Sequence, residues 1–341
     1  MVTPDGTSSR DVTARVHAGD VTSRPATDPV GASGPDGTDP ATGDVHDVVP
    51  CPPDLDPRRS VVRLRRGAGD PTWSDAGGAL WHATRRPTGA ATLRLTPAPG
   101  GVRADAWGPG AADVLGDVPG LLGLLDDPTG FAAHLHPAVA RAHRTHASLR
   151  LARGGDVWAT VVTSVLEQRV VGVDAKASWR RLVGRHGDPA PGPAPAGLRV
   201  APPPAAWGAL PVWEWRQAGV DAHRTDAIRR AAAVAHRLTP DLAPVELARR
   251  LRTVPGIGPW TAAEVTSRAL GDPDAVQVGD AHLPHLVGWA LTGRRADDAG
   301  MLHLLEPWRG HRQRVLVLLE VAYRGRLPAY GPRGRRALPM R

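Results

Sequence analysis

Residues 251–263 read Leu-Arg-Thr-Val-Pro-Gly-Ile-Gly-Pro-Trp-Thr-Ala-Ala, and Asp280 follows 22 residues after Gly258. Two helices joined by a Pro-Gly-Ile-Gly turn present backbone N–H groups at the start of the second helix. Such groups bind a DNA phosphate without reading the base sequence. A carboxylate shortly beyond the turn is placed to act on a nucleotide. The stretch therefore predicts a protein that docks on DNA and cuts a bond there.

The turn is expected to work through its backbone. Gly256 and Gly258 permit positive φ and close approach of another molecule, and Pro259 suits the first turn of a helix. The N–H groups of Gly258, Trp260 and Thr261 would then face a phosphate. The alternative is an ordinary connection between two core helices. The residues on both sides of Gly-Ile-Gly make the pattern more specific than a lone Gly-x-Gly, and this favours DNA docking.

Three side chains around the turn each allow two interpretations. Asp280 either caps a helix, as aspartate often does, or serves catalysis, and the two roles are compatible. Trp260 either belongs to the core or stacks on an extruded base, where a cationic base gains a cation–π interaction. Glu264 lies one turn later on the same helix face. It either lines the same pocket and favours a cation, or it lies on a solvated helix surface.

An almost wholly apolar helix is predicted over 156–171, with Asp156 as its N-cap. Gln168 and Arg169 close this helix. A long side chain at such an end either fills the gap left by a flipped nucleotide or is an exposed polar helix end, and both interpretations stay open.

Charge and cysteine content narrow the class of protein. The net charge is +8, but residues 1–57 contain ten aspartates and three arginines, so they carry −7 and the remainder carries +15. This fits a polyanion partner, although a merely basic soluble protein is the alternative. A single cysteine, Cys51, excludes an internal disulfide and a four-cysteine iron–sulfur cluster. No apolar run approaches the roughly 20 residues of a membrane span, and no secretory pattern is present. We therefore expect a cytoplasmic, nucleoid-associated protein with no membrane partner.

The fold class expected is α+β, predominantly α, with a small antiparallel-sheet domain before an all-helical core. The expected divisions are a disordered acidic segment (1–57), an α+β domain (58–130), a helical core (131–325) and a basic flexible tail (326–341). Order is expected to begin near Ser60. Strands are predicted at 60–65, 79–84, 90–95 and 101–107, and short helices at 111–114 and 120–125. Further helices are predicted at 156–171, 174–186, 206–218, 223–238, 244–252, 259–270, 282–292 and 310–323.

The segment Val254-Pro-Gly-Ile-Gly-Pro-Trp-Thr-Ala262, followed by Val278-Gly-Asp280-Ala-His-Leu283, resembles the helix-hairpin-helix DNA glycosylase superfamily. It is most similar to the 3-methyladenine DNA glycosylase II branch of actinobacterial type. Val165-Leu-Glu-Gln-Arg-Val170 and Leu305-Glu-Pro-Trp-Arg309 resemble further elements of that branch. The likeness covers roughly residues 60–330.

The resemblance implies roles for individual residues. Asp280 would be the catalytic aspartate, and Arg169 would be inserted into the duplex. The base pocket would be lined by Trp260, Glu264 and Leu305. The backbone carbonyls of Arg252, Val254 and Ile257 would hold a structural monovalent cation, Na⁺ or K⁺, and catalysis would need no cofactor.

The resemblance also bears on the reaction type. Family members that cut the strand carry a nucleophilic lysine at the position of Trp260, and the one lysine here is Lys176. Hydrolysis without lyase chemistry is therefore expected. Glu264, Leu305 and Ala281 depart from the residues common in that branch, which leaves the preferred lesion open.

The function predicted is that of a monomeric, monofunctional DNA glycosylase. It would remove alkylated purines, of the 3-methyladenine and 7-methylguanine type, from double-stranded DNA in base excision repair. The alternatives are a non-catalytic helix-hairpin-helix damage-binding protein and a glycosylase for other lesions such as hypoxanthine.

Overall fold

The structure is a computed structural model that describes residues 44–323 and 325. The disorder predicted for residues 1–43 and the flexible tail predicted from residue 326 lie outside the described residues. No helix in the described ranges has the length and apolar character needed to cross a membrane.

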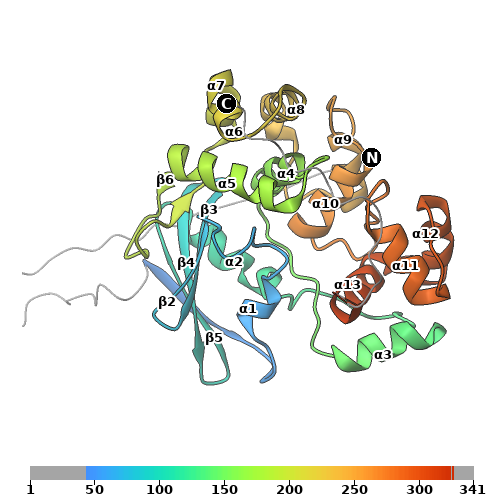
Figure 1. Ribbon diagram of the computed structural model, residues 1–341. Helices are drawn as coiled ribbons and strands as arrows, with labels where there is room; N and C mark the ends of the chain where they lie inside the picture. Colours follow the sequence, from blue (N-terminus) through green and yellow to red (C-terminus); the bar gives the residue numbers. More distant parts are fainter. Residues whose placement is uncertain (1–43, 324, 326–341) are drawn as a thin grey trace, which may run out of the picture. The chain divides into compact units, whose positions relative to one another are not determined.

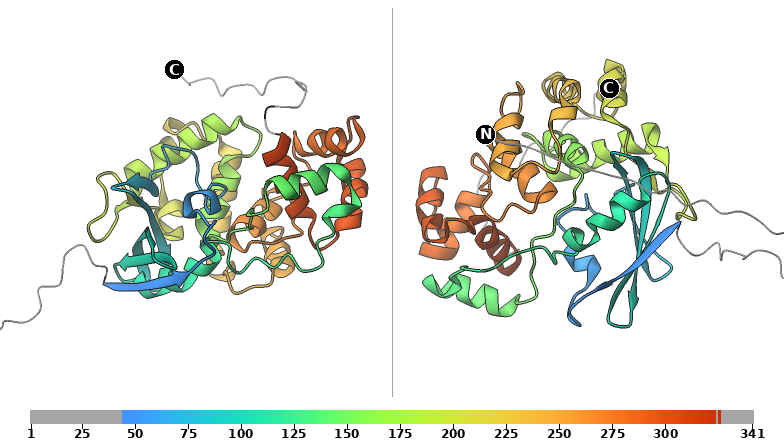
Figure 2. Two further views of the ribbon diagram at one scale, coloured as in Figure 1. Left: turned by 90° about the horizontal axis from the view of Figure 1, so that it is seen from below. Right: turned by 180° about the vertical axis from the view of Figure 1, so that it is seen from behind.

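A five-stranded antiparallel sheet forms the N-terminal part (Figure 1). Its strands are β1 (Val45–Pro50), β2 (Trp73–Ala76), β3 (Ala79–Arg86), β4 (Gly89–Ala98) and β5 (Gly101–Trp107), in the order β1-β5-β4-β3-β2. Helix α2 (Ala111–Leu121) packs on one face of this sheet, as Figures 1 and 2 show. On the other face a short pair, β6 (Asp188–Pro189) and β7 (Arg199–Val200), covers Trp81 and Trp107.

Several expectations for this part were wrong. Disorder was predicted through residue 57, but residues 45–50 form the edge strand β1. Val49 is the one buried residue of this strand, so its sequence has few apolar residues that would indicate a strand. The predicted strand at 60–65 is instead helix α1 (Pro57–Ser60) and turns, because Asp56 caps the first N–H groups and Pro57 begins the helix. Strand β2 was not predicted. The two short helices expected at 111–125 are the single helix α2, which contains Pro119.

The rest of the described chain is mostly helical, which confirms the predicted fold class. The helices are α3 (Pro137–Thr145), α4 (Val157–Leu166), α5 (Gly172–His186), α6 (Pro204–Ala209), α7 (Val212–Gln217), α8 (Ala222–Ala233), α9 (Pro244–Leu251), α10 (Pro259–Ala269), α11 (Leu283–Thr292), α12 (Asp298–Leu305) and α13 (Arg312–Tyr323). The single helix predicted at 206–218 is broken at Leu210, whose extended backbone precedes Pro211. Helix α12 was not predicted.

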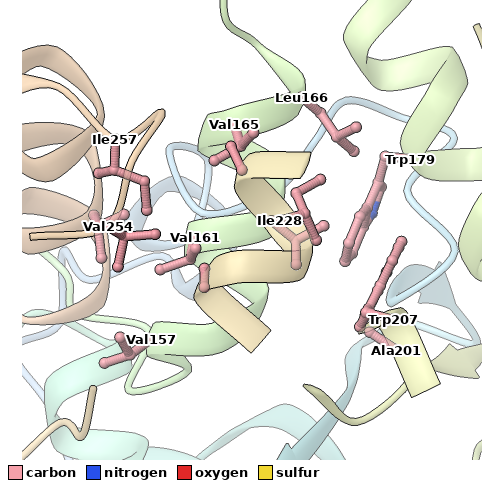
Figure 3. Close-up of a cluster of buried hydrophobic side chains, with 14 of the residues drawn as sticks. Val157, Val161, Val165, Leu166, Trp179, Ala201, Trp207, Ile228, Val254 and Ile257 are labelled. Atoms are coloured by element: carbon pink, nitrogen blue, oxygen red, sulfur yellow. The ribbon is translucent and has the colours of Figure 1, made fainter. Parts of the chain in front are cut away.

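Helix α4 lies at the centre of the largest apolar cluster (Figure 3). Its residue Val161 lies near Val254 and Ile257, the apolar residues of the Pro-Gly-Ile-Gly turn. Elsewhere in the cluster Trp179 stacks on Trp207, with ring centroids 6.1 Å apart. Since Val254 and Ile257 are each only 5% exposed, the turn is anchored to the core through its apolar side chains.

Hydrogen bonds from both ends of α4 and from α5 join the helices to the sheet region. The Asp156 carboxylate accepts from Ala159 N at 2.8 Å, which confirms its predicted N-cap role, and from the Thr84 hydroxyl in β3 at 3.1 Å. The Trp179 indole donates to Asp70 at 2.9 Å. Arg66 reaches Thr163 within α4. The sheet therefore fixes the orientation of the helix on which the turn is packed.

Asp156→Ala should lower the free energy of unfolding by about 1–2 kcal/mol, because the cap of α4 and the bond to Thr84 are lost together. Asp156→Asn should lower it by less, because an amide oxygen can still cap Ala159. Urea unfolding of the three proteins measures both values. Equal losses for the two variants would contradict a capping role.

Candidate DNA-docking and catalytic site

The turn between α9 and α10 has an anchored side and an exposed side. Hydrogen bonds of 3.0 Å from Val254 N to Leu251 O and from Ile257 N to Val254 O fold the turn back on the end of α9. Val254 and Ile257 are buried, whereas Pro255 and Gly258 are exposed. The backbone around Gly258 is therefore the part of the turn that another molecule can reach.

The two glycines of the turn are required for different reasons. Gly256 has φ +99°, and a Cβ added there would lie 2.7 Å from the Cβ of Ala227. Gly258 has φ −94°, and a Cβ there would meet nothing within 4 Å. The expectation of positive φ is thus confirmed for Gly256 and wrong for Gly258. The described part of the fold gives no reason for glycine at 258, which favours close approach by an outside ligand.

The start of α10 is suited to an anion. Among the described residues, the N–H groups of Gly258, Trp260 and Thr261 donate no hydrogen bond, as is usual for the first turn of a helix. The side chain of Thr261 is itself buried, and its hydroxyl accepts a hydrogen bond from Gln168. Thr261 therefore offers a ligand its backbone N–H and not its hydroxyl.

Asp280 lies beside this helix start. One carboxylate oxygen, Oδ1, accepts from His282 N at 2.7 Å and from Leu283 N at 3.0 Å, so Asp280 caps α11. The other oxygen, Oδ2, accepts from the indole Nε1 of Trp260 at 2.9 Å. Three N–H donors thus hold the half-buried carboxylate in one orientation. The hydrogen bond to Trp260 was not predicted, because it depends on how the loop 270–282 returns to α10.

The loop that carries Asp280 is itself fixed. Asp298, at the start of α12, accepts a hydrogen bond from Gly279 N at 3.0 Å, and Gly279 has φ +91°. Sequence reasoning missed Asp298 because α12 was not predicted. Trp260 is half-buried and is not a member of the buried clusters, so it differs from an ordinary core tryptophan.

Glu264 does not lie on a solvated helix surface. Its side chain is buried, and its carboxylate contacts the Arg268 guanidinium at 2.7 Å. Burial raises the pKa of Glu264 to about 8, and the Glu167 carboxylate adds to the rise, while Arg63 and Arg66 oppose it. Its place in a base pocket stays a prediction, since no hydrogen bond or ion pair described here joins it to Trp260 or Asp280.

Two other predicted site residues are placed elsewhere or differently used. Leu305 is fully buried with Met301 and Trp308 in the C-terminal cluster, so it does not line an open pocket in this structure. Leu305 is buried because it lies on the inward face of α12, a helix that was not predicted from the sequence. For Gln168 the sequence left open a gap-filling side chain and an exposed polar helix end, but its amide donates to Gly256 O at 3.0 Å and to the Thr261 hydroxyl at 2.8 Å. Arg169 is exposed.

The predicted cation ligands fit a hard monovalent ion. They are backbone carbonyls, and oxygen donors suit such ions. Within the described ranges, no hydrogen bond uses the carbonyls of Arg252 and Ile257, and that of Val254 accepts one from Ile257 N. The side chains of Arg252, Val254 and Ile257 supply none of the oxygen atoms predicted to bind the cation.

Comparisons with known proteins place the fold. No protein-family model and no curated protein matches the sequence. The 3-methyladenine DNA glycosylase of Archaeoglobus fulgidus superposes with a TM-score of 0.66 at 17% identity, over 79% of this chain and 95% of that one. MBOgg1, solved with a low-affinity DNA ligand, superposes at 0.62 and 15% identity, over 81% and 96%. The apo 8-oxoguanine glycosylase/lyase of Clostridium acetobutylicum superposes at 0.58 and 10% identity, over 76% and 90%. The chain therefore shares its fold with these solved structures, which include a 3-methyladenine DNA glycosylase and an 8-oxoguanine glycosylase/lyase.

Gly258→Ala should leave the free energy of unfolding within about 1 kcal/mol of wild type, because the added methyl group meets only open space. Its affinity for duplex DNA should fall about tenfold or more, as expected when a charged hydrogen bond to a phosphate is disturbed. Gly256→Ala is the matched variant. It should unfold more easily by about 2 kcal/mol, because of positive φ and the clash with Ala227. Fluorescence anisotropy and urea unfolding separate the two effects, and unchanged affinity of Gly258→Ala would contradict the docking site.

Glu264→Gln should change how stability depends on pH. The wild-type carboxyl holds its proton up to about pH 8 when folded, against an ordinary pKa of 4.5. The folded state therefore binds the extra proton, and the free energy of unfolding should fall as pH rises through this window. A neutral amide does not titrate, so the free energy of unfolding of the variant should not fall in this way. It should be similar to that of wild type at pH 5 and about 2–4 kcal/mol higher at pH 8.5. Chemical unfolding at several pH values that gives parallel curves would show that Glu264 is ionised throughout.

Proposed function

We propose that this protein is a monofunctional DNA glycosylase that hydrolyses the N-glycosidic bond of alkylated purines, of the 3-methyladenine and 7-methylguanine type, in base excision repair. The observation that supports it most directly is the position of Asp280. Its carboxylate is hydrogen-bonded to Trp260, two residues from Gly258 at the free start of α10. A phosphate on those N–H groups would leave the sugar of a nearby nucleotide within reach of the carboxylate.

The proposed reaction needs a carboxylate in a fixed position, and hydrogen bonds hold that of Asp280. A purine alkylated at N3 or N7 carries positive charge, so its glycosidic bond is weakened and the base leaves without further protonation. Positive charge then develops on the sugar, and Asp280 stabilises it. Water adds to C1′ and loses one proton to solvent, and the products are the free base and an abasic site.

Trp260 would help to bind the cationic base in the site. Its indole N–H is engaged by Asp280. The ring face remains for stacking, and a cationic purine on that face gains a cation–π interaction of about 0.5–2 kcal/mol. One side chain would thus orient the carboxylate and contact the leaving group.

The position of the single lysine supports hydrolysis without lyase chemistry. The single lysine, Lys176, belongs to α5, and its side chain lies beside Gly67 in the segment before β2. No contact described here joins it to Trp260 or Asp280. A Schiff base at C1′ requires an amine there, so the proposed reaction is hydrolysis alone.

Double-stranded DNA with damaged bases is the proposed partner, and a monomer in the cytoplasm, at the nucleoid, is the proposed form. The charge of +15 on residues 58–341 supports a polyanion partner. Structures with this fold have been solved in complex with DNA, including the Clostridium acetobutylicum enzyme with double-stranded DNA. A monovalent cation held by the carbonyls of Arg252, Val254 and Ile257 would stabilise the turn, and no cofactor would be needed for catalysis.

Excision of 8-oxoguanine is the second candidate, because one of the superposed structures is an 8-oxoguanine glycosylase/lyase, with a TM-score of 0.58. An 8-oxoguanine base is neutral, so its departure needs more assistance than that of an alkylated purine. The Trp260 ring and the negative charge of Asp280 would both interact favourably with a cationic base. The alkylated substrates are therefore favoured over 8-oxoguanine.

Asp280→Asn tests the proposal. The amide keeps the size of the side chain, and its oxygen can still cap α11, but the negative charge is lost. Release of 3-methyladenine from methylated duplex DNA should fall by at least about 100-fold, as for loss of one main electrostatic group, while affinity for duplex DNA stays within about threefold.

Release of radiolabelled base under single-turnover conditions measures the first quantity, and anisotropy measures the second. A variant as active as wild type would refute the role of Asp280. A wild-type protein that binds methylated DNA tightly but leaves no alkali-labile sites would identify a damage-binding protein instead. Release from duplexes that carry 8-oxoguanine or hypoxanthine, measured alongside, ranks the substrates.

A further inference from the structure

The turn that ends α4, residues 166–170, is held by three surrounding elements. The Leu166 carbonyl accepts from the buried Arg224 guanidinium at 2.9 Å. The Glu167 carboxylate lies 3.5 Å from Arg66. Gln168 donates to the hairpin turn between α9 and α10. Arg169 follows as the exposed residue of this turn.

Arg169 has a strained backbone. Its φ is +55°, and it is the one non-glycine residue with positive φ within the described ranges. The left-handed conformation costs about 1–2 kcal/mol for a residue with a Cβ. In the same ranges the Arg169 side chain makes no hydrogen bond or ion pair, so its own side chain does not offset that cost. The strain is therefore maintained by the neighbours of Arg169.

Gln168 is the neighbour that reaches the DNA-docking turn. Its single amide nitrogen, Nε2, donates to Gly256 O at 3.0 Å and to the Thr261 hydroxyl at 2.8 Å. These acceptors lie on either side of Gly258 in the sequence. Both amide protons are used, so the Gln168 side chain is not available to enter a duplex. It spans the backbone that presents the N–H groups of α10.

We propose that Gln168 is a positioning residue that couples the Arg169 turn to the hairpin turn, so that Arg169 projects from a rigid platform shared with the phosphate site. This rests on the proposed function, because it assumes that Arg169 enters the stack when a nucleotide is extruded. When the hairpin turn docks on a DNA phosphate, the Gln168 side-chain amide fixes the distance between Arg169 and the DNA backbone. The backbone conformation of Arg169 is set before DNA arrives, so only the side chain has to be ordered at insertion.

The test uses a double-mutant cycle with Gln168→Met and Arg169→Ala. Methionine matches the length of glutamine and removes both donors. Each protein is mixed with a duplex that carries 2-aminopurine beside a tetrahydrofuran abasic analogue, and the rise in fluorescence reports unstacking without any catalysis. Affinity for undamaged duplex, single-turnover release of 3-methyladenine and the melting temperature are measured on the same proteins.

Gln168→Met should keep undamaged-duplex affinity within about threefold, because the N–H groups of α10 remain. The 2-aminopurine signal should fall by more than half, and base release should fall about tenfold or more. In the Arg169→Ala background the same change should alter the signal and the rate by less than about twofold, because the positioned side chain is already absent. Gln217→Met removes an exposed amide that bonds Arg185 at the end of α7, and this control should change none of these values.

Additive effects of Gln168→Met and Arg169→Ala would overturn the proposal. It would also fail if duplex affinity and melting temperature fell enough to account for the whole loss of signal. If Gln168→Met does not fold, Thr261→Val removes one acceptor with the same shape and should reduce the signal in the same direction. If the wild type unstacks the probe but releases no base, the function proposed above fails while the cycle still decides the role of Gln168.

Discussion

The hydrogen bond of 2.9 Å from the Trp260 indole to Asp280 is the interaction on which the candidate site depends. Trp260 lies in the first turn of α10, whose free N–H groups would hold a phosphate, and Asp280 caps the first turn of α11. The bond therefore fixes the Asp280 carboxylate against a residue of the first turn of α10, beside the proposed anion site. A helix cap by itself, or a glycine-containing turn by itself, would not indicate catalysis.

The remainder of the fold keeps this arrangement rigid. Val254 and Ile257 bury the hairpin turn against α4, and α4 is joined to the sheet through Asp156 and Thr84. Near Glu264, the pairs Arg63–Glu320 and Arg66–Glu167 join the segment after α1 to α13 and to the end of α4. Within α10, Arg268 contacts Glu264. Preorganisation of this kind lets a fixed carboxylate stabilise charge without rearranging during the reaction.

Local sequence signals predicted the central parts well, and the errors have physical causes. Asp156 before an apolar run, and Pro259 after Gly258, mark the starts of α4 and α10 through capping and backbone geometry that need no distant partner. The edge strand β1 buries one residue, so its pattern resembles that of a polar segment. The hydrogen-bond partners of Gln168 lie about 90 residues away in the sequence, and the charges that act on Glu264 come from Glu167, Arg63 and Arg66. Local periodicity does not contain that information. The contacts of these side chains could therefore not be predicted from the sequence.

In the proposed function, the hairpin turn and the Asp280 carboxylate act on the same stretch of DNA backbone. Single neutral methylphosphonate linkages, placed one at a time along a duplex with a 3-methyladenine analogue, test this directly through binding affinity and rate of base release. The account predicts that one linkage within about two nucleotides of the lesion sharply weakens binding and slows release, because the N–H groups of α10 lose their anion. Linkages elsewhere should have much smaller effects. A uniform, weak response at every position, with base release intact throughout, would contradict the account.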